Sequence, residues 1–199
     1  GIGHTRWATH GLPNNTNAHP HTSEDKQIAL VHNGIIENYS ILKEELISRG
    51  HNFESETDTE VLVHLIEDIK KENNCDLFDA IRIALNEVVG AYAIVAIDKN
   101  NPHELVAARK SSPLVIGLGE NEYFLASDAT PIVEYTKNVV YLDDGEIARI
   151  SLEKGLSLKT IQNKNKTPYI QELEMHLEAL EKGGYEHFML KEIYEQPQS

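Results

Sequence analysis

The spacing of apolar residues changes at Gly90, and this change limits the fold more than any other feature of the sequence. Before Gly90, apolar residues recur at the three- and four-residue intervals that predict amphipathic helices. After Gly90, short apolar runs separated by turn residues predict strands in a largely antiparallel meander. Because the helices are grouped and the strands follow them, the pattern predicts an α+β fold in layers and not alternating βαβ units.

Three helices are expected in the first half of the chain. Asn38 or Ser40 can cap the first. The second follows Thr57, which has capping-box spacing to Glu60, and the third starts at Asp76. The second and third helices should stack on one face of a sheet. Strands are expected over residues 2–8, 27–32, 91–98, 104–110, 113–119, 123–127, 139–152 (with a turn at 143–145) and 156–161.

Charge and cysteine content exclude several classes of protein. The sequence has 18 Lys and Arg against 32 Asp and Glu, a net charge of −14, so it lacks the basic surface that nucleic-acid binding requires. We expect no membrane span, because no run approaches roughly 18 apolar residues, and no secretory leader. Cys75 is the only cysteine, which excludes an intrachain disulfide and a cysteine-based zinc site and predicts a reducing, cytoplasmic compartment.

A shift in composition near residue 161 divides the sequence. Residues 1–160 are expected to form the core domain. Residues 161–199 are expected to be a polar linker that leads into an acidic helical segment.

The segment from Arg6 to His10 combines several groups that bind small polar ligands. Arg6 offers a planar fork that suits a carboxylate. Trp7, Thr9 and His10 add an aromatic ring, a hydroxyl and an imidazole where a predicted strand runs into a loop. A plainer interpretation is a surface arginine at a strand end beside a core tryptophan. The residues by themselves favour neither interpretation.

His32-Asn33-Gly34 ends a predicted strand and also allows two interpretations. The Asn33 amide and the Gly34 N–H, which no Cβ obstructs, could both donate to one developing oxyanion. Asn-Gly is also the commonest dipeptide of tight turns, and local chemistry favours the turn.

Three further features of the sequence contain residue types that can carry chemistry. Asp58 lies at or beside a helix start, where it either caps the helix or faces the ammonium group of a substrate. His19-Pro20-His21 has neither an acidic partner at fixed spacing nor a helical zinc motif, so no metal site is predicted. Cys75 has no surrounding motif and is interpreted as incidental.

Longer motifs give the sequence a family resemblance. GHTRWATHG, NAHPH, VHNGIIEN and SETDTE occur in that order, and the match continues through GAYAIVAID, RKSSPLVIGLG and FLASD to MLKEIYEQP. Together they resemble the glutaminase domain of the glutamine–fructose-6-phosphate aminotransferase (isomerizing) family, which belongs to the class II glutamine amidotransferases. The resemblance covers essentially the whole chain. It implies an N-terminal-nucleophile hydrolase fold, a four-layer αββα sandwich.

The resemblance also implies a reaction. Glutamine is hydrolysed to glutamate and ammonia, and the ammonia aminates fructose 6-phosphate in a separate sugar isomerase domain to give glucosamine 6-phosphate. The residues singled out above would divide into two tasks. An oxyanion hole would be formed by Asn33 and Gly34. Glutamine binding would fall to Arg6 (α-carboxylate), Asp58 (α-ammonium), Thr9 and His10 beside them, and Trp7 in a mobile loop that closes over the substrate.

The sequence departs from the family at its start. Family members begin with a cysteine whose thiol attacks the glutamine amide and whose α-amino group serves as base, whereas this sequence begins Gly1-Ile2-Gly3. We therefore expect an N-terminally truncated core that lacks the nucleophile and the isomerase domain and is inactive by itself. Cys75 has no free α-amino group and cannot take the role of the nucleophile.

Two alternatives to this interpretation stay open. One is a module that binds glutamine or glutamate without catalysis, and the other is the glutaminase domain of an amidophosphoribosyltransferase-like enzyme. No cofactor, metal, nucleic acid or membrane partner is expected. The parent protein is expected to be a homo-oligomer through regions outside this sequence.

Overall fold

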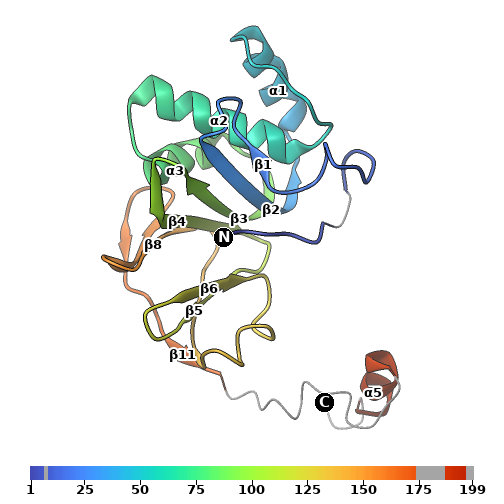
Figure 1. Ribbon diagram of the computed structural model, residues 1–199, viewed down its shortest axis with the longest axis vertical. Coiled ribbons are helices and arrows are strands. Elements are labelled where there is room, and N and C mark those ends of the chain that lie inside the picture. Colours follow the sequence, from blue (N-terminus) through green and yellow to red (C-terminus); the bar gives the residue numbers. More distant parts are fainter. Residues whose placement is uncertain (7–8, 174–186, 196–199) are drawn as a thin grey trace.

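The computed structural model describes residues 1–6, 9–173 and 187–195 and has helices over two sheets (Figure 1). Three helices cover one face of a seven-stranded sheet, and a four-stranded sheet faces the other side. Neighbouring strands in both sheets pair antiparallel. The α+β prediction is confirmed. The described helices are α1 (Tyr39–Ser48), α2 (Asp58–Asn73), α3 (Leu77–Glu87) and α5 (Phe188–Glu195).

Most strands lie where the sequence predicts them. The large sheet has the order β1-β2-β3-β4-β8-β9-β10, and the small sheet has the order β11-β7-β5-β6. The strands of the large sheet are β1 (His21–Thr22), β2 (Ile28–Ile36), β3 (Gly90–Asp98), β4 (Asn101–Lys110), β8 (Glu146–Ser151), β9 (Gly155–Thr160) and β10 (Asn165–Lys166). Those of the small sheet are β5 (Val115–Leu118), β6 (Tyr123–Ala126), β7 (Asn138–Tyr141) and β11 (Gln171–Glu172).

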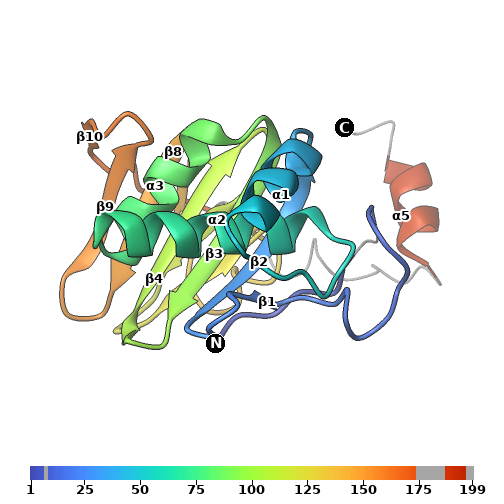
Figure 2. The ribbon, with the colours of Figure 1, turned by 90° about the horizontal axis from the view of Figure 1, so that it is seen from above.

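Side-chain caps explain where two of the helices begin. Thr57 Oγ1 accepts a hydrogen bond from the Glu60 N–H at 3.2 Å, and Asp76 Oδ1 accepts one from the Asp79 N–H at 2.9 Å. Both helices therefore start where the sequence predicts. Figure 2 shows α1, α2 and α3 lying over the strands of the large sheet, and one apolar cluster fills the space between the two layers.

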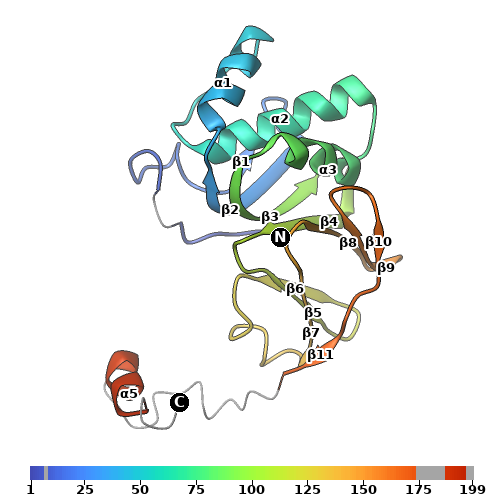
Figure 3. The ribbon, with the colours of Figure 1, turned by 180° about the vertical axis from the view of Figure 1, so that it is seen from behind.

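A second apolar cluster fills the space between the two sheets. Val31 and Val95 contribute from the large sheet, and Ile116 and Val140 contribute from the small sheet. Figure 3 shows the N-terminus of the chain at the level of this space, and Ile2 packs against the cluster. The inner strands of the large sheet are therefore buried on both faces, as their continuous apolar runs predict.

The outer face of the small sheet carries a turn segment. Ala129, Ile132 and Val133 pack with Val115 and Val139 in a third cluster, and residues 130–135 form turns. In the described residues this short segment stands where the αββα sandwich has its fourth, helical layer.

Residues 1–6 form no strand, contrary to the expectation of one over residues 2–8. Arg6 has a φ of 49°, a left-handed conformation that interrupts extended backbone. Residues 7 and 8 lie outside the described residues. The prediction is wrong over residues 2–6, because an apolar run beside a sheet can pack against it without joining its hydrogen-bond ladder.

β2 continues through Asn33 and Gly34, so the tight-turn interpretation is wrong. Gly34 lies opposite Tyr92 of β3 and has a φ of 135°. A Cβ at this position would lie 2.1 Å from the carbonyl oxygen of Ala91. Pairing with β3 overrides the local preference of the Asn-Gly dipeptide, and the close approach of the two strands requires glycine.

The predicted linker contains two short strands. β10 pairs with β9, and β11 pairs with β7, so both sheets extend past residue 160. Residues 174–186 and 196–199 of the predicted acidic segment lie outside the described residues. The division of the chain at residue 160 stays a prediction. Among the helices that the structure describes, none is long and apolar enough to cross a membrane.

We predict that Gly34→Ala destabilises the protein far more than Gly145→Ala. Both glycines have positive φ angles, 135° and 77°, so alanine is strained at either position by about 1–2 kcal/mol. Gly34 adds the contact with the Ala91 oxygen, whereas nothing lies within 4 Å of a Cβ at Gly145. Overpacking of this kind costs a further ~1–3 kcal/mol. Urea denaturation of the full-length variants measures the difference, and equal losses would contradict the close approach.

Candidate functional site

Six of the seven predicted site residues line one cavity of about 260 Å³, the site cavity. It forms where the start of α2 meets β2 and the segment before β1. The seventh residue, Trp7, lies outside the described residues. The six are Arg6, Thr9, His10, Asn33, Gly34 and Asp58, and the wall is completed by His4, His19, His32, Ile35, Thr57 and Thr59.

Asp58 is buried at the first position of α2, with 4% of its side chain exposed. Its Oδ2 atom accepts a hydrogen bond from the Ile36 N–H at 2.8 Å, and its Oδ1 atom lies 3.9 Å from His10 Nδ1. Thr57, and not Asp58, caps the helix. The capping interpretation of Asp58 is therefore wrong. The carboxylate joins α2 to β2, and its second oxygen is directed toward the site cavity.

Arg6 is half-buried in the cavity wall and not on a free surface. His10 Nδ1 lies 3.3 Å from Thr9 Oγ1 in the same loop. The Arg6 guanidinium holds this loop closed and adds a positive charge to the cavity wall. It does so by donating hydrogen bonds to the carbonyl oxygens of Leu12 at 3.1 Å, Gly11 at 3.4 Å and His10.

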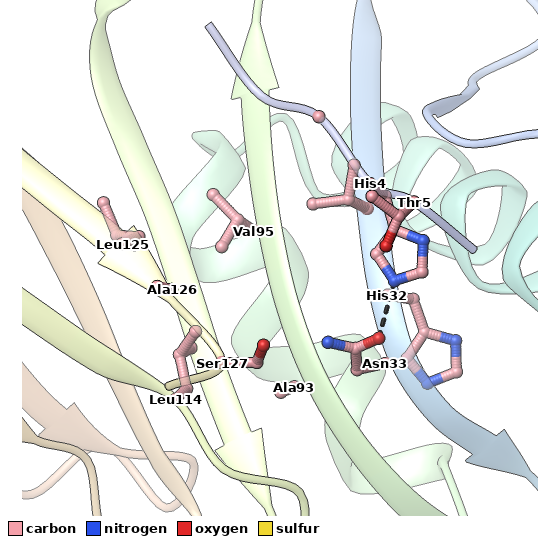
Figure 4. Close-up of a pocket in the computed structure, with 12 residues that line it drawn as sticks. His4, Thr5, His32, Asn33, Ala93, Val95, Leu114, Leu125, Ala126 and Ser127 are labelled. Atoms are coloured by element: carbon pink, nitrogen blue, oxygen red, sulfur yellow. Dashed lines mark hydrogen bonds between the residues drawn. The ribbon is translucent and has the colours of Figure 1, made fainter. Parts of the chain in front are cut away.

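Asn33 stands between the site cavity and an adjoining cavity of about 430 Å³. Figure 4 shows the adjoining cavity, with Asn33 Oδ1 joined to His4 Nε2 and the Asn33 amide nitrogen pointing away from His4. The bond measures 2.6 Å. Among the described residues, nothing accepts a hydrogen bond from Asn33 Nδ2. This donor is therefore available to a ligand.

Two histidines, the buried His32 and the half-buried His19, share one hydroxyl group in the cavity wall. Thr59 Oγ1 lies 3.0 Å from His32 Nδ1 and 3.2 Å from His19 Nε2. Among the described residues, the second ring nitrogens of both, His32 Nε2 and His19 Nδ1, have no hydrogen-bond partner. Sequence analysis missed these residues as parts of the site. The signal was present as a concentration of five histidines in the first 32 residues.

Burial keeps this histidine group uncharged. The pKa of His19 falls from the ordinary 6.5 to about 3, mainly through burial and in smaller part through the neighbouring His4 and His21 imidazoles, which disfavour a second positive charge beside them. Burial also lowers the pKa of His21 and of His32. Within the cavity wall, the imidazoles of His19 and His32 are therefore neutral at pH 7. In the described part of the chain, no three potential ligands gather as a metal ion would require.

Cys75 lies away from the site cavity. It lines a separate cavity with Lys70, Asp76 and Asp98, at the start of α3. Burial, followed by the nearby Asp79 and Asp76 carboxylates, raises the pKa of its thiol. The interpretation of Cys75 as incidental agrees with this position, because a raised pKa disfavours the reactive thiolate.

Comparison with known proteins adds a family match. A model of the family described as "Glutamine amidotransferase domain" matches residues 4–134, a range that includes every residue of the site cavity. A solved structure of glutamine phosphoribosylpyrophosphate (PRPP) amidotransferase from B. subtilis, complexed with ADP and GMP, is 30% identical with a TM-score of 0.64. The matched region covers 79% of the present chain and 34% of the chain in the solved structure.

Two curated relatives are much closer in sequence, and both are named glutamine–fructose-6-phosphate aminotransferase [isomerizing]. The one from Bacteroides thetaiotaomicron is 62% identical over 197 residues, and the one from Chlorobaculum tepidum is 56% identical over 199 residues. The matches cover 99% and 100% of this chain but only 32% of each relative. The chain thus spans about a third of the length of these relatives.

We predict that acid destabilises the fold partly through His19. The folded protein keeps His19 neutral down to a pH of about 3, whereas the unfolded chain binds a proton near pH 6.5. The stability that His19 contributes is therefore complete above pH 6.5 and lost as the pH falls toward 3, by at most about 1.4 kcal/mol per pH unit. Urea denaturation between pH 7 and pH 5 should show a shallower loss in His19→Gln than in the exposed control His103→Gln. Equal slopes would contradict the lowered pKa of His19 in the folded protein.

Proposed function

Because the chain belongs to the glutamine amidotransferase domain family, we propose that the protein containing it hydrolyses the side-chain amide of glutamine at the site cavity. The products are glutamate and ammonia. Convergence of six residues on one cavity carries the proposal. The cavity offers a cation, an anion and an amide donor, and glutamine presents a carboxylate, an ammonium and an amide carbonyl.

Each charged group of glutamine has a partner of opposite charge in the wall. Asp58 Oδ1, which the Ile36 bond leaves unused, accepts from the α-ammonium. Arg6 attracts the α-carboxylate, with Thr9 and His10 beside it, and Trp7 belongs to the loop that closes over the substrate. Support for Arg6 comes from its charge and its place in the wall, because part of its guanidinium already holds loop carbonyls.

Asn33 and Gly34 supply the oxyanion hole in this proposal. Asn33 Nδ2 is a free donor. Along an antiparallel ladder, opposite residues that exchange hydrogen bonds alternate with opposite residues that exchange none. The Glu37 N–H donates to Val89 O, so this pair is a hydrogen-bonded one, and Gly34 lies three positions before Glu37 in the same strand register. The alternation makes Gly34 and Tyr92 a pair that exchanges no hydrogen bonds, so the Gly34 N–H is not used by β3. Two donors on adjacent residues can then stabilise one oxygen as its negative charge grows.

The chemistry proceeds through an acyl-enzyme. A thiol, which the family resemblance places on a cysteine outside this sequence, attacks the amide carbon and moves the carbonyl electron pair onto oxygen. The α-amino group of that cysteine takes the thiol proton and passes it to the amide nitrogen as the tetrahedral intermediate collapses. The carbon–nitrogen bond breaks, ammonia departs, and a γ-glutamyl thioester remains. Water hydrolyses the thioester to glutamate and returns the thiol.

For the whole protein, we propose that the ammonia aminates fructose 6-phosphate to glucosamine 6-phosphate in a separate sugar isomerase domain. The names and lengths of the two curated relatives support this step. A cytoplasmic location and a homo-oligomeric parent belong to the same proposal.

Glutamate formation by the full-length protein tests the proposal directly. We expect glutamate from glutamine, with glucosamine 6-phosphate formed when fructose 6-phosphate is added. Binding of glutamine without any glutamate would support a binding module instead. Ammonia transfer to phosphoribosyl pyrophosphate, and not to fructose 6-phosphate, would support an amidophosphoribosyltransferase.

We predict that Asn33→Ala lowers kcat for glutamine hydrolysis by about 10²–10³ and leaves KM nearly unchanged. The Asn33 donor faces an oxygen that carries negative charge mainly in the transition state, so its loss raises the barrier without weakening substrate binding. Steady-state glutamate release from the full-length variant measures both constants. An unchanged kcat with a raised KM would exclude the oxyanion role.

We predict the opposite pattern for the two charged residues. Arg6→Ala and Asp58→Asn each remove a charge that pairs with glutamine in both the ground state and the transition state, so KM should rise by about 10–100-fold while kcat changes less. Asp58→Asn is the sharper variant, because its amide oxygen can still accept from the Ile36 N–H. Loss of kcat at unchanged KM in Asp58→Asn would contradict ammonium binding.

A further inference from the structure

An asparagine amide presents a donor on one side and an acceptor on the other, and the two orientations have nearly the same shape. Only the Nδ2 side of Asn33 can stabilise an oxyanion, whereas the Oδ1 side would repel it. The oxyanion role therefore requires some group that fixes which side faces the substrate.

The backbone determines the tautomer of His4. The Arg6 N–H donates a hydrogen bond to His4 Nδ1 at 2.8 Å. A backbone N–H can only donate, so Nδ1 must be unprotonated. An imidazole with an unprotonated Nδ1 is neutral and carries its hydrogen on Nε2.

This tautomer in turn determines the orientation of Asn33. His4 Nε2 lies 2.6 Å from Asn33 Oδ1, and Nε2 is the donor of the pair. The reverse amide orientation would bring the Nδ2 hydrogens against the Nε2 hydrogen, donor against donor. Figure 4 shows the result, with the oxygen of Asn33 toward His4 and the nitrogen on the opposite side.

The His4 ring packs against a second imidazole, that of His19. Its centroid lies 4.4 Å from that of the His19 ring, at an interplanar angle of 37°. His19 is held by Thr59 Oγ1 at 3.2 Å, and its low pKa keeps it uncharged beside His4. Two consecutive hydrogen bonds thus connect the Arg6 backbone N–H to His4 and His4 to the Asn33 amide.

We propose that His4 is a positioning residue that holds the Asn33 amide with its Nδ2–H donor toward the carbonyl oxygen of glutamine. His4 contacts neither the substrate carbon nor the leaving nitrogen in this role. It acts through Asn33, and the inference rests on the proposed function.

Two isosteric variants of the full-length protein test this role. In His4→Gln the side-chain amide nitrogen takes the place of Nε2 and can still donate to Asn33 Oδ1. In His4→Asn the side-chain oxygen takes the place of Nδ1 and still accepts from the Arg6 N–H, but no donor reaches Asn33. We expect His4→Asn to lose about tenfold in kcat at unchanged glutamine KM, and His4→Gln to stay within about threefold of the unchanged protein.

Combination with Asn33→Ala completes the test. Once the amide is gone, His4→Asn should lower kcat no further. Equal kcat values in His4→Asn and His4→Gln, whether both normal or both low, would overturn the positioning role, as would a full further loss in the Asn33→Ala background. A raised KM in His4→Asn at normal kcat would overturn it as well. These outcomes differ from failure of the proposed function, in which the unchanged protein forms no glutamate or Asn33→Ala keeps its kcat.

Discussion

The hydrogen bond from the Ile36 N–H to Asp58 Oδ2 joins the last residue of β2 to the first residue of α2, and the candidate site depends on it. The bond sets the strand that carries Asn33 against the helix start that carries Asp58. It also uses one oxygen of a buried carboxylate, so the other oxygen is left for the cavity. The N-terminal end of the α2 dipole stabilises that buried charge. One contact between layers therefore places both the anion and the amide donor of the site.

Elements set by local chemistry were predictable from the sequence. The start of α2 follows from the Thr57 side chain and the apolar spacing after it, and both involve neighbouring residues. β2 beyond His32 was not predictable in this way, because its continuation through Gly34 depends on pairing with Tyr92, far along the chain. The strand predicted over residues 2–6 was wrong for a related reason. Their apolar pattern predicts burial against a sheet but does not decide whether a ladder forms.

The site was predictable in part. Local chemistry left Arg6 undecided between function and ordinary structure and favoured an ordinary turn at Asn33, and the motif resemblance assigned both their roles. The family behind that resemblance is confirmed, and six of the assigned residues do line one cavity. The supporting histidines were missed because their partners are distant: His4 bonds to a residue 29 positions away, and His19 to one 40 positions away. Only the folded chain reveals which tautomer His4 adopts.

A crystal structure of the full-length protein with bound glutamate tests the central claim most directly, that this cavity binds the amino acid and presents the Asn33 donor to its side chain. The account predicts the α-ammonium on Asp58, the α-carboxylate beside Arg6, and a side-chain oxygen about 3 Å from Asn33 Nδ2. Glutamate bound outside the site cavity, or bound there with its side-chain oxygens facing away from Asn33, would contradict the account.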